Sequence, residues 1–156
     1  MEYKISPVSI ADHQTWLSLW RAYCDFYEVA LEDRITTRTW LRIIDPSEPV
    51  HSLIALSATG EGLGICNYVC HPNTWSDQIV CYLEDIFVAP AGRRNGIATS
   101  FIKSLQDIGN RENWRRIYWI TNRDNVVAQA TYDRIAKRTG HVRYEISFEN
   151  RPSNIK

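Results

Sequence analysis

Two adjacent carboxylates, Glu84 and Asp85, lie inside the apolar segment Ile79–Val88, which we expect to be a long central strand. A carboxylate in so apolar a strand is costly to bury unless it is paired or used, and one that is used can exchange a proton with a substrate. Because neighbouring residues of a strand point to opposite faces, we expect Asp85 to share a face with Leu83 and Phe87. The alternative for each acid is a structural ion pair or a hydrogen bond.

The turn after this strand has the composition of an anion site. Residues 91–98 read AGRRNGIA and open an amphipathic helix. Unpaired N–H groups and the positive end of the helix dipole meet at such a point and favour phosphate. Gly96 lets the backbone approach an anion closely, and the small Ala98 permits tight packing. The turn is neither a Walker loop nor a dinucleotide fingerprint. The alternative is an ordinary turn with two solvated arginines, Arg93 and Arg94.

A third group of residues lies further along the chain, on the helix that we expect over residues 125–139. Asn125 stands at its start, where the chain leaves the expected strand Arg116–Thr121. Tyr132 lies about two helical turns further on. Taken alone, Tyr132 fits packing in the core.

The remaining elements complete a single α+β domain over residues 1–150, followed by a loose tail at 151–156. We expect the order β-α-α-β-β-β-α-β-α-β, with a mixed sheet. Its first half comprises strand Tyr3–Pro7, a helix after the capping box of Ser9 and Asp12, a helix from Thr36 or Thr37 to Ile44, and strands Val50–Ser57 and Leu63–Cys70. Its second half comprises a loop at 71–78, strand Ile79–Val88, a helix from about Asn95, and strands Arg116–Thr121 and Val142–Phe148 on either side of the helix at 125–139.

Charge is divided unevenly along the chain, although the net charge is zero. Residues 1–90 contain 12 Asp and Glu against 5 Lys and Arg, and residues 91–156 contain 13 Lys and Arg against 6 Asp and Glu. The first part is suited to a cation and the second to a polyanion, although accidental segregation on a mixed surface is the alternative. The basic excess lacks the aromatic interleaving of a nucleic-acid module. No apolar run suggests a membrane span, so we expect a cytoplasmic protein.

The four cysteines lack metal-binding or redox spacing. Cys66 and Cys70 fall on one face of an expected strand, which is typical of buried, reduced thiols in the cytosol. A metal site formed with His71 is the alternative, and we expect no metal.

Three motifs, in order and spacing, resemble the GNAT superfamily of N-acetyltransferases over nearly the whole chain. They are LEDIFV at 83–88, Arg93-x-x-Gly96-x-Ala98, and Asn125-x-x-Ala128-x-x-x-Tyr132. Within the superfamily, YLED at 82–85 is similar to the diamine (spermidine/spermine) acetyltransferases. The segment 16–29 and Asn73-Thr74-Trp75 resemble the histone and polyamine acetyltransferase branch. The chain departs from the family pattern at Arg94, where glycine is frequent, and at RIAKRTG (134–140), which is longer by about one helical turn.

The resemblance implies a fold whose central strands splay apart to hold acetyl-CoA. The pantetheine arm would pair with the strand, the diphosphate would lie on the turn, and an asparagine would bond the pantetheine or acetyl end. The cofactor-binding residues implied are Ile86, Phe87, Val88, Arg93, Arg94, Asn95, Gly96, Ile97, Ala98, Asn125 and Ala128. Glu84 would act as the base, directly or through water, and Tyr132 as the acid that protonates the thiolate of coenzyme A.

The acceptor implied is a primary amine of a cationic, polyamine-like or lysine-type molecule. Asp85, Tyr27, Glu28 and Trp75 are the candidate substrate-binding residues. Asp25 and the aromatic stripe of the first helix, Trp16, Trp20, Tyr23 and Tyr27, would complete an acidic, aromatic pocket. The stripe also fits the core, so we expect only one or two of its residues to face substrate. The alternatives are an aminoglycoside, an amino acid or a protein amine as acceptor, or a non-catalytic acyl-CoA-binding module. The branch also predicts a homodimer.

Overall fold

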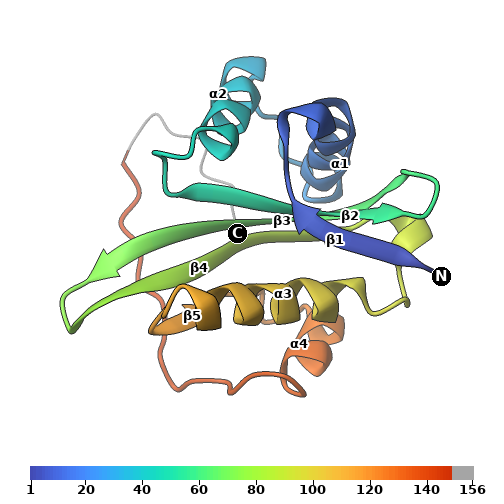
Figure 1. Ribbon diagram of the computed structural model, residues 1–156. Helices are drawn as coiled ribbons and strands as arrows, with labels where there is room; N and C mark the ends of the chain where they lie inside the picture. Colours follow the sequence, from blue (N-terminus) through green and yellow to red (C-terminus); the bar gives the residue numbers. More distant parts are fainter. Residues whose placement is uncertain (149–156) are drawn as a thin grey trace. The chain divides into compact units, whose positions relative to one another are not determined.

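The computed structural model describes residues 1–148, which belong to two compact units, one of residues 1–119 and a second that starts at Ile120. The first unit contains a mixed five-stranded sheet whose spatial order follows the sequence (Figure 1). The first four strands pair antiparallel, and the fifth pairs parallel to the fourth. The strands are β1 (Tyr3–Pro7), β2 (Val50–Ser57), β3 (Gly62–Asn73), β4 (Ser76–Val88) and β5 (Arg116–Tyr118).

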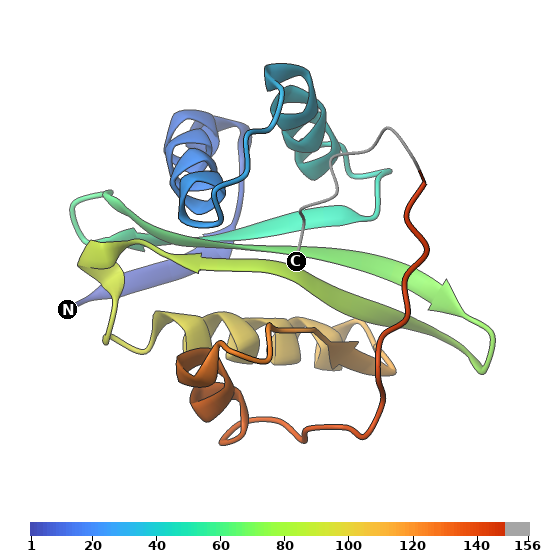
Figure 2. The same ribbon diagram turned by 180° about the vertical axis from the view of Figure 1, so that it is seen from behind.

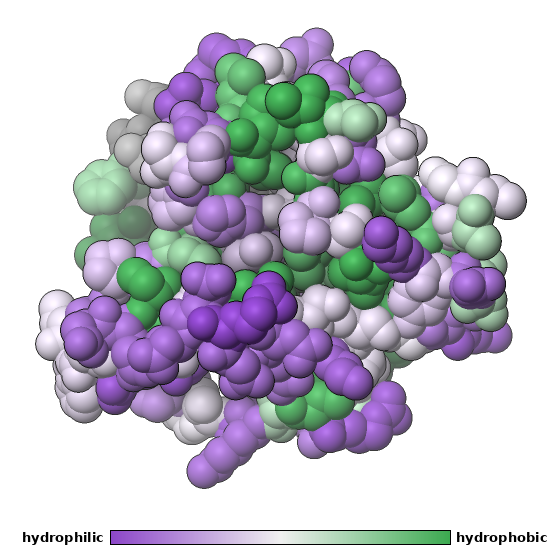
Figure 3. Space-filling view, in the orientation of Figure 1, coloured by the Kyte–Doolittle hydropathy of each residue, from purple (hydrophilic) through white to green (hydrophobic). Residues whose placement is uncertain are grey.

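Helices cover both faces of this sheet. Helices α1 (His13–Phe26) and α2 (Asp33–Ile44) lie on one face and α3 (Ile97–Arg111) on the other, as Figures 1 and 2 show from opposite sides. The parallel β4–β5 pair needs a long crossover, which α3 supplies. The outward side of α3 is largely hydrophilic (Figure 3). The predicted α+β fold is therefore confirmed. The second unit contains α4 (Val126–Tyr132).

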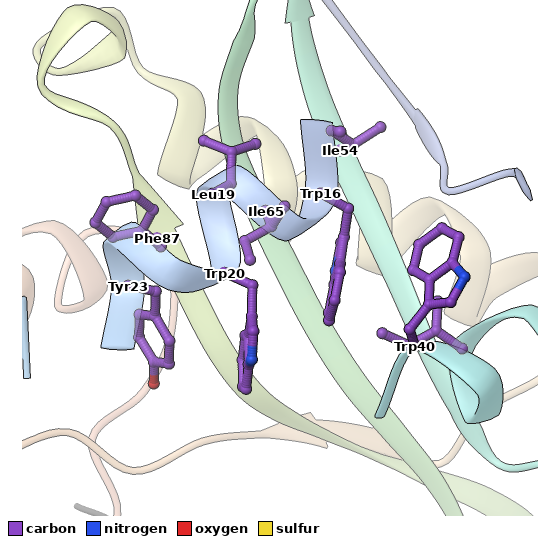
Figure 4. Close-up of a cluster of buried hydrophobic side chains, with 9 residues drawn as sticks. Trp16, Leu19, Trp20, Tyr23, Trp40, Ile54, Ile65 and Phe87 are labelled. Carbon is purple, nitrogen blue, oxygen red and sulfur yellow. The ribbon is translucent and has the colours of Figure 1, made fainter. Parts of the chain in front are cut away.

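The core between the sheet and α1 is built on aromatic rings (Figure 4). The rings of Trp16 and Trp20 stack with their planes 10° apart and their centroids 5.5 Å apart, and Trp40 of α2 lies 5.3 Å from Trp16. Trp16, Trp20 and Tyr23 are buried, whereas Tyr27 is 43% exposed. The prediction that the stripe lies mainly in the core is confirmed, and the prediction that one or two of its residues face substrate stays a prediction.

Both ends of α1 follow from local chemistry. The amide and hydroxyl of Ser9 donate to the carboxylate of Asp12 at 2.8 and 2.7 Å, and a short 3-10 turn, η1 (Ile10–Asp12), leads into the helix. This arrangement confirms the predicted capping box. Glu28 closes the helix at φ 55°, and its N–H donates to the carbonyl of Asp25 at 3.1 Å. Glycine is the usual residue at this position, so Glu28 carries backbone strain.

The prediction that α2 begins at Thr36 or Thr37 is wrong, because the helix begins at Asp33 after an extended Glu32. The acidic side chain in the first turn complements the helix dipole there. The predicted end of the helix at Ile44 is confirmed.

The loop predicted over residues 71–78 is also wrong. β3 and β4 continue as a hairpin to Asn73 and Ser76, which lie opposite each other. The side chain of Asn73 closes the turn: it accepts from the N–H of Trp75 at 3.0 Å and donates to the carbonyl of Gln78 at 2.7 Å. An asparagine side chain can take the place of a backbone group in a turn by bonding backbone groups nearby. The loop-forming residues of this segment therefore make a tight turn between two long strands.

The C-terminal predictions differ most from the structure. β5 ends at Tyr118 rather than at Thr121, and the helix predicted to reach residue 139 ends at Tyr132. The strand predicted over 142–148 is wrong, because these residues form no strand and the described sheet has no ladder that includes them. Their alternating apolar pattern suits a strand, but a strand requires a neighbour for its backbone groups. The predicted tail at 151–156 lies outside the described residues.

Candidate active site

Strand β4 carries one residue more than β3 at the step from Asn67 to Tyr68. Asn67 lies opposite Asp85, and the next residue of β3, Tyr68, lies opposite Leu83. Glu84 is therefore the extra residue of a β-bulge, a feature that re-aims side chains and is common beside active sites. Glu84 is exposed, whereas Asp85 and Leu83 are buried.

The bulge corrects the faces predicted from simple alternation. Paired residues of neighbouring strands share a face, so Asp85 lies on the side of Asn67 and Leu83 on that of Tyr68. Asn67 accepts a hydrogen bond from the indole of Trp16 at 3.5 Å, which marks its side as the α1 face. Tyr68, one residue further along β3, points to the α3 face. Asp85 and Leu83 therefore lie on opposite faces.

Asp85 is held by hydrogen bonds under α1. The hydroxyl of Tyr23 donates to its Oδ1 at 2.7 Å, and the amide of Asn67 donates to its Oδ2 at 3.2 Å. Burial of the phenol and the charge of the carboxylate raise the pKa of Tyr23 far above its ordinary value. Asp85 is only 8% exposed. Its geometry is that of the hydrogen-bonded acid given above as the alternative to a chemical role.

The outer edge of β4 is open next to the bulge. β5 pairs only with Val80–Tyr82, and in the described sheet no strand lies beyond Leu83–Val88 on that side. An open strand edge presents backbone N–H and C=O groups that an extended ligand can pair with. Glu84 stands at this edge, so backbone groups without a neighbouring strand and an exposed carboxylate meet on one strand.

The turn after β4 is braced from two sides. A 3-10 turn, η2 (Pro90–Gly92), leads into it, and the side-chain amide of Asn95 donates to the carbonyls of Gly92 and Arg93 at 3.3 and 3.0 Å. From β1, the hydroxyl of Tyr3 donates to the carbonyl of Asn95 at 3.2 Å. The path of the turn is thereby set by contacts that are independent of any ligand.

Two residues of this turn adopt left-handed backbone conformations: Arg94 at φ 63° and Gly96 at φ 77°. Gly96 is the N-cap of α3 and has no side chain to cap the helix, so the N–H groups of the first turn, which starts at Ile97, have no acceptor within the helix. Ile97 is buried and anchors this end, whereas Arg94 is exposed. The glycine that is frequent at position 94 in the resembling family is explained by this φ value.

Arg93 is directed towards the end of α1. Its Nε donates to the carbonyl of Val88 at 3.3 Å, and its guanidinium lies 5.8 Å from the ring centroid of Phe26. Phe26 also packs near Phe87, with centroids 6.5 Å apart. The turn, the end of β4 and the end of α1 thus converge, and Ile86, Phe87, Val88 and residues 93–98 lie together.

Of the predicted substrate-binding residues, Tyr27 and Glu28 lie at the C-terminal end of α1, beside this region. The ring of Tyr27 makes an edge contact with that of Tyr23 at 5.0 Å, and burial together with the charge of Asp85 raises its pKa. Trp75 lies elsewhere, at the tip of the β3–β4 hairpin and 85% exposed. The nine residues of β4 from Ser76 to Glu84 span about 26 Å.

The second unit contains Asn125, Ala128 and Tyr132. The side-chain oxygen of Asn125 accepts from the N–H of Ala128 at 3.2 Å and caps α4. Tyr132 is the last residue of α4, and its carbonyl accepts from the N–H groups of Ile135 and Ala136 at 3.0 and 2.9 Å. The motif Asn125-x-x-Ala128-x-x-x-Tyr132 therefore spans α4 from its N-cap to its last residue.

Asn67 and Tyr3 contribute to the site but escaped the sequence reasoning. Asn67 was visible as a lone amide in the apolar run LGICNYVC, and a buried amide requires partners. Tyr3 gave no such signal, because its contact to Asn95 spans 92 residues.

Within residues 1–148, no group of three or more His, Cys, Asp or Glu side chains is arranged to hold a metal ion. In the same part of the chain, no helix combines the length and apolarity needed to span a membrane.

This geometry was compared with known proteins. Residues 16–136 match the acetyltransferase (GNAT) family. The D-amino-acid N-acetyltransferase HPA3 of Saccharomyces cerevisiae is 26% identical over 142 residues, which are 90% of this chain and 88% of that protein. A ribosomal-protein-alanine N-acetyltransferase from Brucella melitensis biovar Abortus 2308 has a TM-score of 0.80 at 19% identity, over 95% of this chain and 100% of its own. The structure of AAC(6')-Iy with the bisubstrate analogue CoA-S-monomethyl-acetylneamine has a TM-score of 0.80 at 20% identity, over 95% and 99%.

The chain belongs to the acetyltransferase (GNAT) family, because the matched residues cover most of its length. It is an N-acetyltransferase that uses acetyl-CoA as donor and an amine-bearing molecule as acceptor. AAC(6')-Iy has also been solved with CoA bound. The expected enzyme class and cofactor are confirmed, whereas the resemblance to the polyamine and histone branch stays a prediction.

Proposed function

We propose that this enzyme transfers the acetyl group to a primary amine by direct attack, with Glu84 as base and Tyr132 as acid. The observation that carries the proposal is the β-bulge, which leaves Glu84 exposed at the open edge of β4 while Asp85 is buried and hydrogen-bonded. Of the two adjacent acids, Glu84 is the exposed one, whereas Asp85 is only 8% exposed.

The acceptor requires a base for a simple reason. An amine with a pKa of about 10.4 is about 99.9% protonated at pH 7 and has no lone pair for attack. Glu84 would take this proton, directly or through water. Tyr132, a phenol with an ordinary pKa of about 10, would donate its proton to the departing thiolate, whose conjugate acid has a pKa of about 8.5. Acetyl-CoA itself supplies the thioester.

The donor would be held mainly by backbone groups. The open edge at Ile86, Phe87 and Val88 suits the extended pantetheine arm, and the first-turn N–H groups of α3 suit the diphosphate. The proposed diphosphate contacts are the amides of Arg94, Asn95, Gly96, Ile97 and Ala98, with charge from Arg93 and Arg94. Arg93 already lies beside Val88, which supports a role where strand and turn meet. Asn125 and Ala128 would bind the pantetheine or acetyl end.

We propose a cationic, polyamine-like acceptor as the first candidate. The residues that support it are acidic or aromatic and lie at the end of α1 or under it: Asp25, Tyr27, Glu28 and Asp85. Such a set attracts ammonium groups by charge and by cation–π contact. Trp75 is not carried into this proposal because of its position at the hairpin tip.

An amino acid with an apolar side chain is the second candidate. The rings of Phe26 and Tyr27 are 59% and 43% exposed and meet edge to face at 5.1 Å, which makes an apolar wall beside the same region. The D-amino-acid specificity in the name of the HPA3 relative agrees with this candidate.

Thiol release from acetyl-CoA, measured against matched acceptors, would decide between the two candidates. Spermidine and putrescine represent the first, and D- and L-phenylalanine the second. Preference for a polyamine by tenfold or more in kcat/KM would support the first candidate, and the reverse order the second. Turnover of neither, with coenzyme A binding intact, would favour an aminoglycoside or a protein amine as acceptor. Homodimer formation and a cytoplasmic location stay predictions.

A further inference from the structure

Cys70 of β3 and Cys81 of β4 lie directly opposite each other. The N–H of Cys70 donates to the carbonyl of Pro49 at 2.9 Å, so this residue directs its backbone groups towards β2. Cys70 and Cys81 therefore form a non-hydrogen-bonded pair of the antiparallel ladder. In such pairs the Cα atoms are about 4.5 Å apart and the side chains lie closer together than in hydrogen-bonded pairs. Disulfides accept Cα separations of about 4.4–6.8 Å. The backbone already holds the two thiols at a suitable spacing.

The two thiols differ in accessibility and acidity. Cys70 is partly exposed and Cys81 is fully buried. The neighbouring thiol of Cys81 and the ring of His51, together with the charges of His51 and His71, lower the pKa of Cys70 well below its ordinary value. The neighbouring thiol of Cys70 and burial raise the pKa of Cys81. This asymmetry is the one expected of an attacking and a resolving thiol.

The other two cysteines provide an internal comparison. Burial and the charge of Asp85 raise the pKa values of both Cys24 and Cys66. Cys24 and Cys70 are both partly exposed, but the charges that act on the thiol of Cys24 are those of Asp85 and Asp25 rather than of histidines. If exposure alone set the reactivity of the thiols, Cys24 and Cys70 would therefore react at similar rates.

We propose that Cys70 and Cys81 form a redox modification site that reacts with small-molecule disulfides. The Cys70 thiolate attacks one sulfur of oxidised glutathione, which forms a mixed disulfide and releases one glutathione thiolate. The thiol of Cys81 then loses its proton to that thiolate or to solvent and attacks the Cys70 sulfur, releasing the second glutathione. The protein loses two protons and two electrons, and these convert one glutathione disulfide into two thiols.

The direct test is incubation of the folded protein with oxidised glutathione at pH 7, followed by mass spectrometry. Chymotryptic cleavage after Tyr68 and Trp75 separates Cys66, Cys70 and Cys81 into three peptides. We expect the peptides of Cys70 and Cys81 to stay joined until a reductant is added. We expect Cys81→Ala to stop at one glutathionyl group on Cys70, and Cys24→Ala to behave as the parent protein.

A second measurement compares alkylation rates of single thiols by iodoacetamide at pH 6. The larger thiolate fraction of Cys70 outweighs the lower nucleophilicity of an acidic thiol, so we expect it to react about fivefold faster than Cys24, or more. Equal rates would overturn the proposal. Joining of the two peptides only in urea, or modification of Cys24 in preference to Cys70, would overturn it as well. Far-ultraviolet circular dichroism confirms that each variant is folded.

Discussion

The hydroxyl of Tyr23 on α1 donates to the carboxylate of Asp85 on β4 at 2.7 Å, inside the core. This contact gives the two acids of β4 different environments. Asp85 is engaged with α1 and β3, whereas Glu84, one residue before it, is exposed at the bulge. Glu84 and Asp85 both carry a carboxylate, but the bulge leaves the first exposed and the second buried.

Tyr23→Phe should change how stability depends on alkaline pH. Burial and Asp85 raise the pKa of Tyr23 in the folded state, while the unfolded residue ionises at about pH 10. Unfolding above pH 10 therefore releases a proton, and stability falls as pH rises. Relative to Tyr23→Phe, the parent protein should lose about 1.4 kcal/mol more per pH unit above that point. Urea unfolding between pH 9 and 11 measures this slope, and Tyr144→Phe, at a residue 91% exposed, should retain the parent slope.

Glu84→Gln should lower kcat about 100-fold near pH 7, because the acceptor amine then has no base. The deficit should shrink as the pH approaches the pKa of the amine, since free amine forms unaided. A pH profile of kcat for both proteins measures the recovery. Glu61→Gln, at an exposed residue of the β2–β3 turn, should leave the profile unchanged. A deficit of constant size at every pH would remove Glu84 from the role of base.

Tyr132→Phe should lower kcat about tenfold or more while the Kd for acetyl-CoA stays nearly constant. The substitution removes only the phenolic proton, and α4 keeps its cap from Asn125. Stopped-flow thiol release and calorimetry give the two quantities. Tyr144→Phe serves as the control here too, and an unchanged kcat in Tyr132→Phe would exclude the acid role.

Gly96→Ala should raise the Kd for acetyl-CoA, and Gly60→Ala offers a matched control. Both glycines have positive φ values, 77° and 85°, and a Cβ at either would meet no atom closer than 3.9 Å. Each alanine should therefore cost about 1–2 kcal/mol of stability through its backbone alone. Only the variant at the N-terminus of α3 should bind the cofactor more weakly in calorimetry. Equal affinities in the two variants would move the cofactor away from this turn.

Arg94→Gly should stabilise the fold and at the same time weaken the binding of acetyl-CoA. Relief of the left-handed conformation at φ 63° should stabilise the fold by about 1 kcal/mol. Loss of the cation should raise the Kd for acetyl-CoA, with an effect that diminishes at high salt. Thermal unfolding and calorimetry at two salt concentrations test both parts. A tighter Kd at low salt would contradict the role of Arg94 in binding the diphosphate.

The sequence predicted what depends on local chemistry. The bounds of β2, the end of β4 at Val88 and the capping box at Ser9 all follow from periodicity, turn residues and capping. The turn that opens α3 also follows from local sequence, because Gly96 and the start of α3 are adjacent in the chain, and its binding of phosphate stays a prediction.

What the sequence did not predict depends on partners distant in the chain. The bulge at Glu84 exists only through the pairing of β4 with β3, so the alternation rule placed Leu83 and Asp85 on one face. The brace from Tyr3 links β1 to a turn 92 residues away. The strand expected at 142–148 has the right pattern, but a pattern supplies no neighbouring strand.

The buried carboxylate of Asp85 also guards against slippage during hairpin assembly. If β4 moved by one residue along β3, every side chain of the shifted stretch would change face, and this charge would lose Tyr23 and Asn67 as donors. An uncompensated charge in an apolar layer costs several kcal/mol. Misaligned hairpins would thus be rejected early, and the chain would assemble with Glu84 already at the open edge.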